Sequence, residues 1–260
     1  MFKCVKAYKK DILVKIMSNK RAFCLITVKP NVIWLDFLNK MADDYDVFVM
    51  IDDNSNYDTI IKQYPLLIFI QINDDYCKSK GYMNANFIIE KKPSGWDKAM
   101  LYFTKMVTDY DYCWFCEDDV FFYDINTIKN IDNNYPNSDL LCKKYNMNET
   151  GNMKDWHWHQ AQPFFDLPWL NAMVCCCRLS NKLLSYIGDF SDKCGTITFV
   201  ECLFPTVAHQ TNLTIDTPSE FDNIHWRNKW ENFELDDTQF YHPFKNIEDH
   251  VSLRQTRTFS

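Results

Sequence analysis

The feature that most constrains this chain is an alternation of short apolar runs with amphipathic segments over residues 22–116. Apolar runs of strand length stand at 22–28, 46–51, 66–72 and 112–116. The segments between them have helical spacing, most clearly at Trp96, Met100, Phe103 and Val107. Continuous apolar strands that alternate with helices indicate a parallel sheet covered on both faces. The sequence therefore predicts an α/β fold with a central, mostly parallel sheet flanked by helices.

The second half of the chain is less regular. We expect strands at 140–142, 172–177 and 213–216, and helices at 179–187 and 199–209. The segment 155–165 is an aromatic and His-rich loop, and the tail from Pro218 is polar and irregular. Because no repeat or low-complexity linker divides the chain, we expect one domain over residues 1–260.

The composition excludes several classes of function. The formal net charge is −7 with Lys and Arg scattered, whereas a protein that grips nucleic-acid phosphates presents a basic face, so no nucleic-acid partner is expected. Glycine occurs only 5 times, and the glycine-rich loops of dinucleotide oxidoreductases and P-loop enzymes do not occur. An acidic enzyme that binds a diphosphate needs a metal ion to bridge the like charges.

The 11 cysteines are expected to be reduced thiols, most of them in the core. Cys113 and Cys116 lie in a predicted buried strand, so we interpret them as core residues and not as half of a zinc site. The first 20 residues lack the apolar stretch of a signal peptide, and no apolar run is long enough to cross a membrane. We therefore expect a cytoplasmic protein without a membrane span.

Two acidic clusters follow predicted buried strands directly. Asp52-Asp53 comes after the strand at 46–51, and Glu117-Asp118-Asp119 comes after the strand at 112–116. In an open parallel sheet the carboxyl ends of the strands line one edge, and ligands bind in the crevice outside that edge. Both clusters should therefore face the same crevice, whereas the other Asp pairs of this chain are expected to be solvated turns.

The acidic triplet is the candidate metal site. Side chains alternate along an extended segment, so Glu117 and Asp119 should point one way and Asp118 the other. Two carboxylates on one side can share a hard divalent cation, Mn²⁺ or Mg²⁺, which would neutralise charge on a leaving nucleoside diphosphate. The alternative is a capped turn in which one acid pairs with a nearby Lys.

The stretch Tyr110 to Val120, which contains Glu-Asp-Asp, resembles the DxD region of GT-A glycosyltransferases, and 47–55 resembles the strand of that fold whose end meets the nucleotide base. The resemblance implies a Rossmann-type sandwich in which residues 22–123 bind a nucleotide-sugar, expected to be a UDP-sugar, and residues 124–260 bind a glycan or other hydroxyl acceptor.

The same resemblance assigns roles to individual acids. It implies that Asp119 binds the metal directly and that Glu117 contacts the metal through water or contacts the ribose. It places Asp52 and Asp53 near the nucleotide, and we group Asp118 with them.

A helix is expected to begin at Trp96-Asp97-Lys98, between the two acidic clusters. A helix N-terminus favours an anion, so these three residues are candidates for contact with the donor, with Lys98 adding a positive charge. A solvated Lys is the alternative.

An inverting transferase needs a carboxylate that deprotonates the acceptor hydroxyl. Glu201 is the candidate, because it is a lone acid among apolar residues, a setting that raises the pKa of a carboxyl group. The alternative is a Glu that caps a helix.

Histidines could complete the metal site. His225 is the first candidate for a third ligand and His209 the second, while His157 and His159 could form a separate zinc site, for which no further ligand stands at a short spacing. The aromatic residues around them could form a platform for acceptor sugars or a small core; these residues are Trp156, Trp158, Phe164, Phe165 and Trp169.

Two other functions remain open at this point. A metal-dependent phosphoesterase or other hydrolase would use a second carboxylate cluster beside the first metal ion, which Asp52-Asp53 could supply. A non-catalytic relative would keep the fold and bind a partner.

Overall fold

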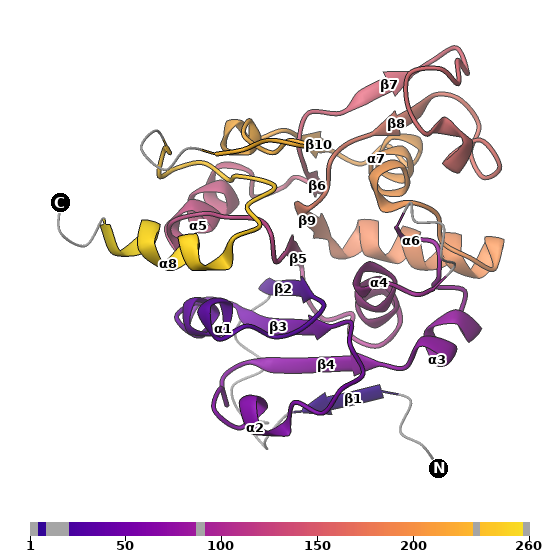
Figure 1. Ribbon diagram of the computed structural model, residues 1–260. Coiled ribbons are helices and arrows are strands. Elements are labelled where there is room, and N and C mark those ends of the chain that lie inside the picture. The colour runs from indigo at the N-terminus through magenta and orange to yellow at the C-terminus, as the bar shows by residue number, and fades with distance from the viewer. Residues whose placement is uncertain (1–4, 9–20, 87–91, 231–234, 257–260) are drawn as a thin grey trace.

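A computed structural model describes residues 5–8, 21–86, 92–230 and 235–256 (Figure 1). The strands are β1 (Val5–Tyr8), β2 (Arg21–Thr27), β3 (Asp46–Ile51), β4 (Ile68–Ile72), β5 (Tyr112–Glu117), β6 (Leu140–Leu141), β7 (Asn146–Asn148), β8 (Trp169–Asn171), β9 (Cys176–Ser180) and β10 (Ile215–Asp216). The helices are α1 (Val32–Asn39), α2 (Asp58–Ile61), α3 (Asp74–Ser79), α4 (Gly95–Lys105), α5 (Ile125–Asn134), α6 (Asn181–Cys194), α7 (Val200–Gln210) and α8 (Ile247–Thr256).

The strands form one large mixed sheet in the order β1-β4-β3-β2-β5-β9-β6-β10, and β7 pairs with β8 separately. β4, β3, β2 and β5 are parallel neighbours, so their carboxyl ends share one edge. β9 runs antiparallel to both β5 and β6. The predicted α/β fold with a mostly parallel central sheet is confirmed.

Helices cover both faces of the sheet, as the continuous apolar strands predict. In β2, Ala22 and Cys24 face the core that contains α4, α6 and α7, whereas Phe23 and Leu25 face the core that contains α1 and α5. The period of two along a strand thus supplies both cores from one run of residues.

The predicted strands of the first half agree closely with the structure, and the prediction at 172–177 is wrong. There the chain forms β8 and β9, separated by residues 172–175, which lie outside any strand. Val174 and Cys175 are buried, so their apolar character reflects burial beside a cavity and not strand pairing. The buried strand β9 instead begins at Cys176 and ends at Ser180. Within it, the guanidinium of Arg178 pairs with Asp132 at 2.7 Å.

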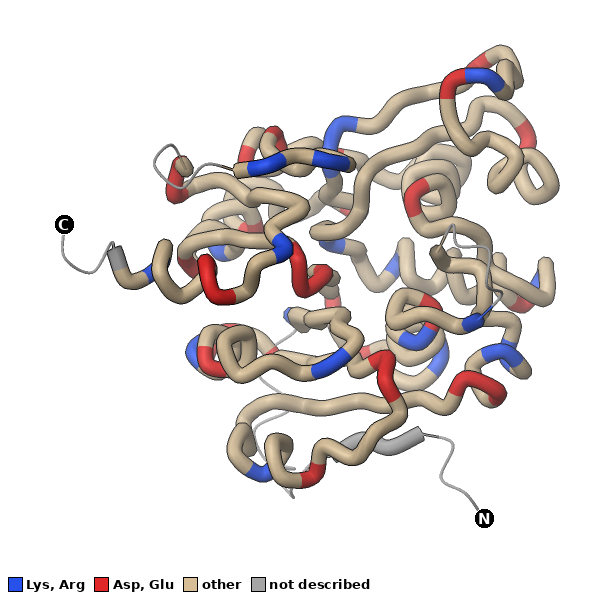
Figure 2. Tube along the Cα trace, viewed as in Figure 1, with Lys and Arg blue, Asp and Glu red and all other residues tan. Residues whose placement is uncertain are grey.

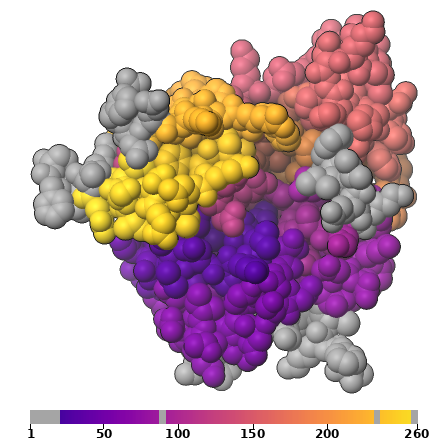
Figure 3. Space-filling view, in the orientation of Figure 1, coloured from indigo at the N-terminus to yellow at the C-terminus, as the bar shows by residue number. Residues whose placement is uncertain are grey.

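The polar tail contains structure that the sequence did not predict. Phe121 and Tyr241 form an antiparallel bridge, and α8 then packs near α1. In Figure 3 this C-terminal segment, in yellow, lies directly against the purple N-terminal part of the chain. Arg254 of α8 donates to the carbonyl of Phe122 at 2.9 Å and lies 3.8 Å from the ring centroid of Phe37. The last described segment is therefore anchored beside the end of β5.

Within the described residues, no helix has both the length and the apolar character needed to cross a membrane. Ten cysteines in this part of the chain are free thiols, and all except Cys194 are buried, Cys113 and Cys116 included.

Candidate metal centre and its cavity

The acidic triplet begins with the last residue of β5 and continues into a turn. The N–H of Val120 closes this turn by donating to the Glu117 carbonyl at 3.2 Å. The backbone N–H of Glu117 donates to the carbonyl of Cys175 at 2.8 Å, and the indole N–H of Trp34 donates to the carbonyl of Asp118 at 2.8 Å. The hydroxyl of Thr27 donates to the carboxylate of Asp118 at 2.5 Å. Asp118 therefore points away from Glu117 and Asp119, as predicted, although residues 118 and 119 form a turn and not an extended strand.

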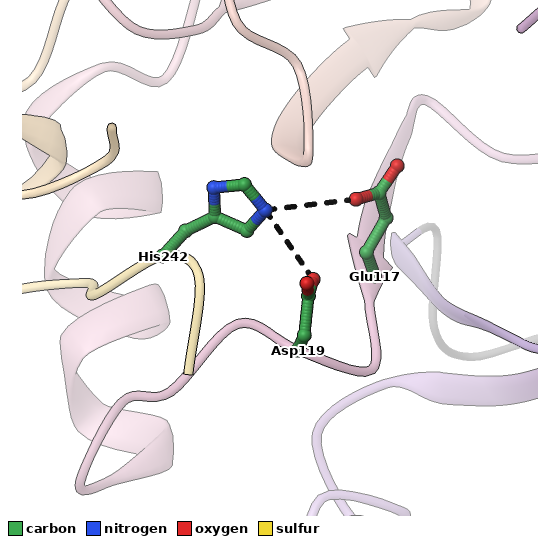
Figure 4. Close-up of side chains that lie close together, drawn as sticks. All are labelled: Glu117, Asp119 and His242. Carbon is green, nitrogen blue, oxygen red and sulfur yellow. Dashed lines mark ion pairs between the residues drawn. The ribbon is translucent and has the colours of Figure 1, made fainter. Parts of the chain in front are cut away.

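Glu117, Asp119 and His242 converge at this point (Figure 4). His242 Nε2 lies 3.3 Å from a carboxylate oxygen of Asp119 and 3.9 Å from one of Glu117. One ligand atom from each side chain lies within 4.8 Å of the other two, and no other such group of three occurs in the described part of the chain. In Figure 2, red for Asp and Glu marks the end of β5 near the middle of the view.

The third residue of the cluster is His242, whereas the sequence analysis favoured His225. The backbone of His225 supports His242 instead, because its N–H donates to the His242 carbonyl at 3.1 Å and its carbonyl accepts from His242 Nδ1 at 2.8 Å. The ring of His225 lies against Trp230. His209, the second candidate, is in the last turn of α7 and outside the cluster.

The hydrogen bond at Nδ1 fixes the tautomer of the neutral His242 ring. A carbonyl oxygen can only accept, so Nδ1 carries a proton, and Nε2 presents its lone pair to the carboxylates when the ring is neutral. Burial lowers the pKa of His242, but the hydrogen bond and charge of Asp119, together with the charge of Glu117, raise it to a value above 6.5. Burial and the neighbouring Asp119 raise the pKa of Glu117, although the bond from Trp96 opposes this.

Glu201 lines the same cavity, in the first turn of α7. Burial raises the pKa of its carboxyl group to about 8, and the negative charge of Glu117 adds to this effect. Its backbone carbonyl accepts from the N–H of Ala172, and among the described residues its carboxyl group has no hydrogen-bond partner. The carboxyl group is thus free to meet a ligand.

The cavity has a volume of about 1080 Å³. Its lining includes Glu117, Asp119 and His242, together with Glu201, Phe199 and Met173 from the part of the chain that follows β8. Basic residues from the C-terminal part also line the cavity, namely Arg227, Lys229 and Lys245. All three are exposed, and none has an ion pair in the described residues.

The three residues of the predicted helix start, 96–98, have three different surroundings. The indole N–H of Trp96 donates to Glu117 Oε1 at 2.5 Å, and Trp96 lines the cavity. Asp97 forms a capping box with Ser94 and is buried, so it completes the helix end. Lys98 is also buried, with its ammonium group 2.7 Å from carboxylates of both Asp52 and Asp74. It is neither solvated nor open to an anion.

Asp52 and Asp53 lie at the carboxyl edge of the sheet, as predicted, but outside the lining of this cavity. Asp52 pairs with Lys98. Asp53 accepts bonds from the N–H and hydroxyl of Ser55 and from the hydroxyl of Tyr57, and these bonds lower its pKa. The structure therefore brings Glu117, Asp119, Trp96 and Glu201 together and leaves these two acids apart.

The aromatic loop is mainly a small core. Trp158 and Trp169 are buried and packed on each other, whereas Trp156 stacks on Phe199, which lines the cavity. Phe165 stacks on Phe190 of α6, and Phe164 also contacts that ring. His157 and His159 are exposed and belong to no metal-ligating group of three among the described residues.

The sequence matches no protein-family model and no curated protein. Solved structures are similar in fold. The galactosyltransferase LgtC in complex with donor and acceptor sugar analogues aligns over 91% of this chain and 95% of its own, with a TM-score of 0.52 and 9% identity. An active-site mutant of LgtC gives a TM-score of 0.50 at 10% identity, again over 91% and 95% of the two chains. Mouse xyloside xylosyltransferase 1 gives 0.45 at 9% identity, over 87% and 98%.

At these identities the likeness to LgtC shows the fold alone. That fold is the GT-A-like sandwich that the resemblance at the acidic triplet implied.

Proposed function

We propose that this chain is a metal-dependent glycosyltransferase that moves a sugar from a nucleotide-diphosphate sugar, with UDP as the expected nucleotide, to a hydroxyl group of a glycan or other acceptor. The observation that carries the proposal is the convergence of Glu117, Asp119 and His242 at the carboxyl edge of the sheet, on a cavity that also contains Glu201. Ligands of open α/β sheets bind at this edge.

The cluster has the donor set for a hard or borderline divalent ion. Two carboxylates and one neutral imidazole suit Mn²⁺ better than Mg²⁺, because Mg²⁺ prefers oxygen ligands. The bond from His242 Nδ1 to the His225 carbonyl orients the ring for this purpose. When bound, the ion would supply Lewis-acid stabilisation of the diphosphate leaving group. The three side chains would hold the ion, and Arg227, Lys229 and Lys245 add positive charge to the same cavity.

Glu201 is proposed as the general base of an inverting transfer. The acceptor oxygen would form a bond to the anomeric carbon, and its proton would pass to the Glu201 carboxylate. The bond between the anomeric carbon and the diphosphate oxygen would break, and its electron pair would leave with the nucleotide. A carboxyl group with a pKa raised to about 8 is a stronger base than an exposed one, and this supports the assignment.

The proposed division of labour follows the two parts of the cavity. Residues 22–123 provide Glu117 and Asp119 for the donor, and residues 124–260 provide Glu201 for the acceptor. His242 joins the donor site from the second part, so the division is not strict.

The test is calorimetry of UDP binding with Mn²⁺ present and, separately, with a chelator. We expect binding that depends on Mn²⁺, together with transfer of sugar to a hydroxyl acceptor. Equal UDP affinity in both conditions would refute the metal requirement, and binding without transfer would favour a non-catalytic relative. Release of phosphate from UDP or from a phosphate ester would favour a hydrolase.

The hydrolase has less support than the transferase. A two-metal site needs a second carboxylate cluster within about 4 Å of the first metal. Asp52 is engaged with Lys98, and Asp53 is engaged with Ser55 and Tyr57.

A further inference from the structure

The two carboxylate oxygens of Glu117 have different surroundings. Oε1 accepts the indole N–H of Trp96 at 2.5 Å, whereas Oε2 faces His242 Nε2 at 3.9 Å. Trp96 is only 4% exposed, and Glu117 is the acceptor of its indole N–H. A largely buried donor that loses its acceptor is costly, so this bond holds Oε1 beside the indole.

The fold fixes the indole in place. Gly95 begins α4 against β2, and a Cβ at this position would lie 2.6 Å from Cγ2 of Ile26, so the helix start depends on the missing side chain. The ring of Trp96 then packs between Phe115 of β5 and Phe204 of α7, with centroid distances of 6.0 and 5.9 Å. The donor is thus held from three elements of the core.

The bond from Trp96 fixes the plane of the Glu117 carboxylate, with Oε1 toward the indole and Oε2 toward His242, so Oε2 is the oxygen placed to bind an ion shared with His242. Mg²⁺ and Mn²⁺ accept one oxygen per carboxylate in octahedral sites, whereas Ca²⁺ takes more oxygen ligands and often binds both oxygens of one carboxylate. To chelate Ca²⁺ with both oxygens, Glu117 would have to turn its carboxylate plane and bring Oε1 toward the ion, which would bend or lengthen the bond from the Trp96 N–H.

We propose that Trp96 is a positioning residue that restricts Glu117 to one ligand oxygen and thereby makes the centre select Mn²⁺ or Mg²⁺ over Ca²⁺. This inference rests on the metal centre of the proposed function. Trp96 acts through Glu117 and is assigned no contact with the ion.

The test is the affinity of the full chain for Mn²⁺ and for Ca²⁺, each measured by calorimetry without nucleotide, in the wild type and in Trp96→Phe. Loss of a partner that orients a metal ligand typically weakens metal binding by about 10–100-fold. We expect Mn²⁺ affinity to fall in that range while Ca²⁺ affinity falls less or rises. The ratio of the two dissociation constants should therefore shift by about tenfold or more toward Ca²⁺.

Trp114→Phe is the matched control. Trp114 is fully buried, and its indole N–H donates to Asp132 at 3.0 Å, so the substitution removes the same kind of bond away from the cavity lining. It should lower the melting temperature and leave the metal ratio unchanged. If Trp96→Phe leaves both affinities unchanged, or lowers both by one common factor, the selectivity role is refuted.

Two further outcomes are decisive. If Trp96→Phe does not fold, 3-benzothienylalanine placed at position 96 keeps the ring volume and lacks only the N–H, and the same shift in ratio is expected. A wild-type chain that binds neither ion would overturn the metal centre and this inference with it, whereas a wild type that binds Mn²⁺ with an unshifted ratio in the variant overturns this inference alone.

Discussion

Two acidic clusters stand at the same edge of the sheet, and their surroundings differ. At the end of β3, the Asp52 carboxylate and carbonyl both contact the buried ammonium group of Lys98, which also binds Asp74. At the end of β5, the ion pairs of Glu117 and Asp119 within the described residues are with His242, whose ring becomes cationic only on protonation. The first cluster contains its own cation and the second does not.

This difference separates two uses of the same residue type. Asp52 and Asp74 both pair with the buried Lys98, so their charge is already compensated. These ion pairs connect the end of β3, α3 and α4. Acids that face one another beside a neutral imidazole repel, and a divalent ion would relieve that repulsion. Sequence position after a buried strand brings both clusters to the edge, but the neighbouring cation decides which one is open to a metal.

Asp119→Ala tests the open cluster and should have the largest effect. We expect loss of Mn²⁺-dependent UDP binding and of sugar transfer, because a direct ligand is removed. In chelator the melting temperature should change little, since the substitution removes both the repulsion from Glu117 and the contact with His242 at 3.3 Å, and it removes no packed apolar group. Asp166→Ala, at an exposed position, is the control. A marked drop in melting temperature in chelator would instead indicate a structural turn.

Glu201→Gln tests the acid that α7 contributes to the cavity. The amide keeps the shape of the carboxyl group but cannot take a proton, so transfer should slow by about 10²–10⁴ while donor affinity changes little. Glu149→Gln, at an exposed position, should transfer at the wild-type rate. Because the base must be ionised, wild-type turnover should rise with pH through the pKa of Glu201, which is about 8 without metal. A bound cation beside Glu117 should lower that midpoint. Near-normal transfer by the Gln variant would place the base elsewhere.

Lys98→Met tests the compensated cluster. Removing the ammonium group leaves Asp52 and Asp74 facing each other without their cation, so we expect a loss of about 2 kcal/mol in the free energy of unfolding. Mn²⁺ affinity should be nearly unchanged, because Lys98 is not part of the metal cluster. Urea denaturation and calorimetry measure the two quantities. A large loss of Mn²⁺ affinity with normal stability would reverse the assigned roles of the two clusters.

The smallest expected effect is the pH dependence of the open cluster. Protons compete with the metal for His242 Nε2, and Asp119 and Glu117 outweigh burial to raise the pKa of this ring above 6.5. The Mn²⁺ dissociation constant should therefore increase by up to about tenfold per pH unit below that pKa and level off above it. Calorimetry across this range measures the trend. Affinity that does not change with pH would exclude His242 as a ligand.

The fold and part of the site could be predicted from local patterns. Strands β2 to β5 are continuous apolar runs, and the acid triplet follows the last of them. The structure also places Glu201 on the cavity, as its apolar setting suggested, although its role as a base stays a prediction.

The sequence did not predict His242 as a ligand, because the position of its side chain depends on long-range pairing. The aromatic character of the run 240–244 was the available signal. Two long-range bridges, Tyr241 to Phe121 and His242 to Ile224, bring the imidazole to the acids. Lys98 shows the same limit. Its sequence context gives a helix start, whereas its charge partners come from β3 and α3.

The bridge between Phe121 and Tyr241 also links ion binding to the folding of the C-terminal segment. Glu117 and His242 are far apart in sequence, so an ion held by both would close a long loop. Bringing the two ends of such a loop together costs conformational entropy relative to the unfolded chain. At a concentration of about 100 times its dissociation constant, such an ion would stabilise the docked segment by about 2.7 kcal/mol. Amide hydrogen exchange along residues 240–244 would then slow with metal occupancy. Undocking of the segment would lower the affinity for the ion by the same factor.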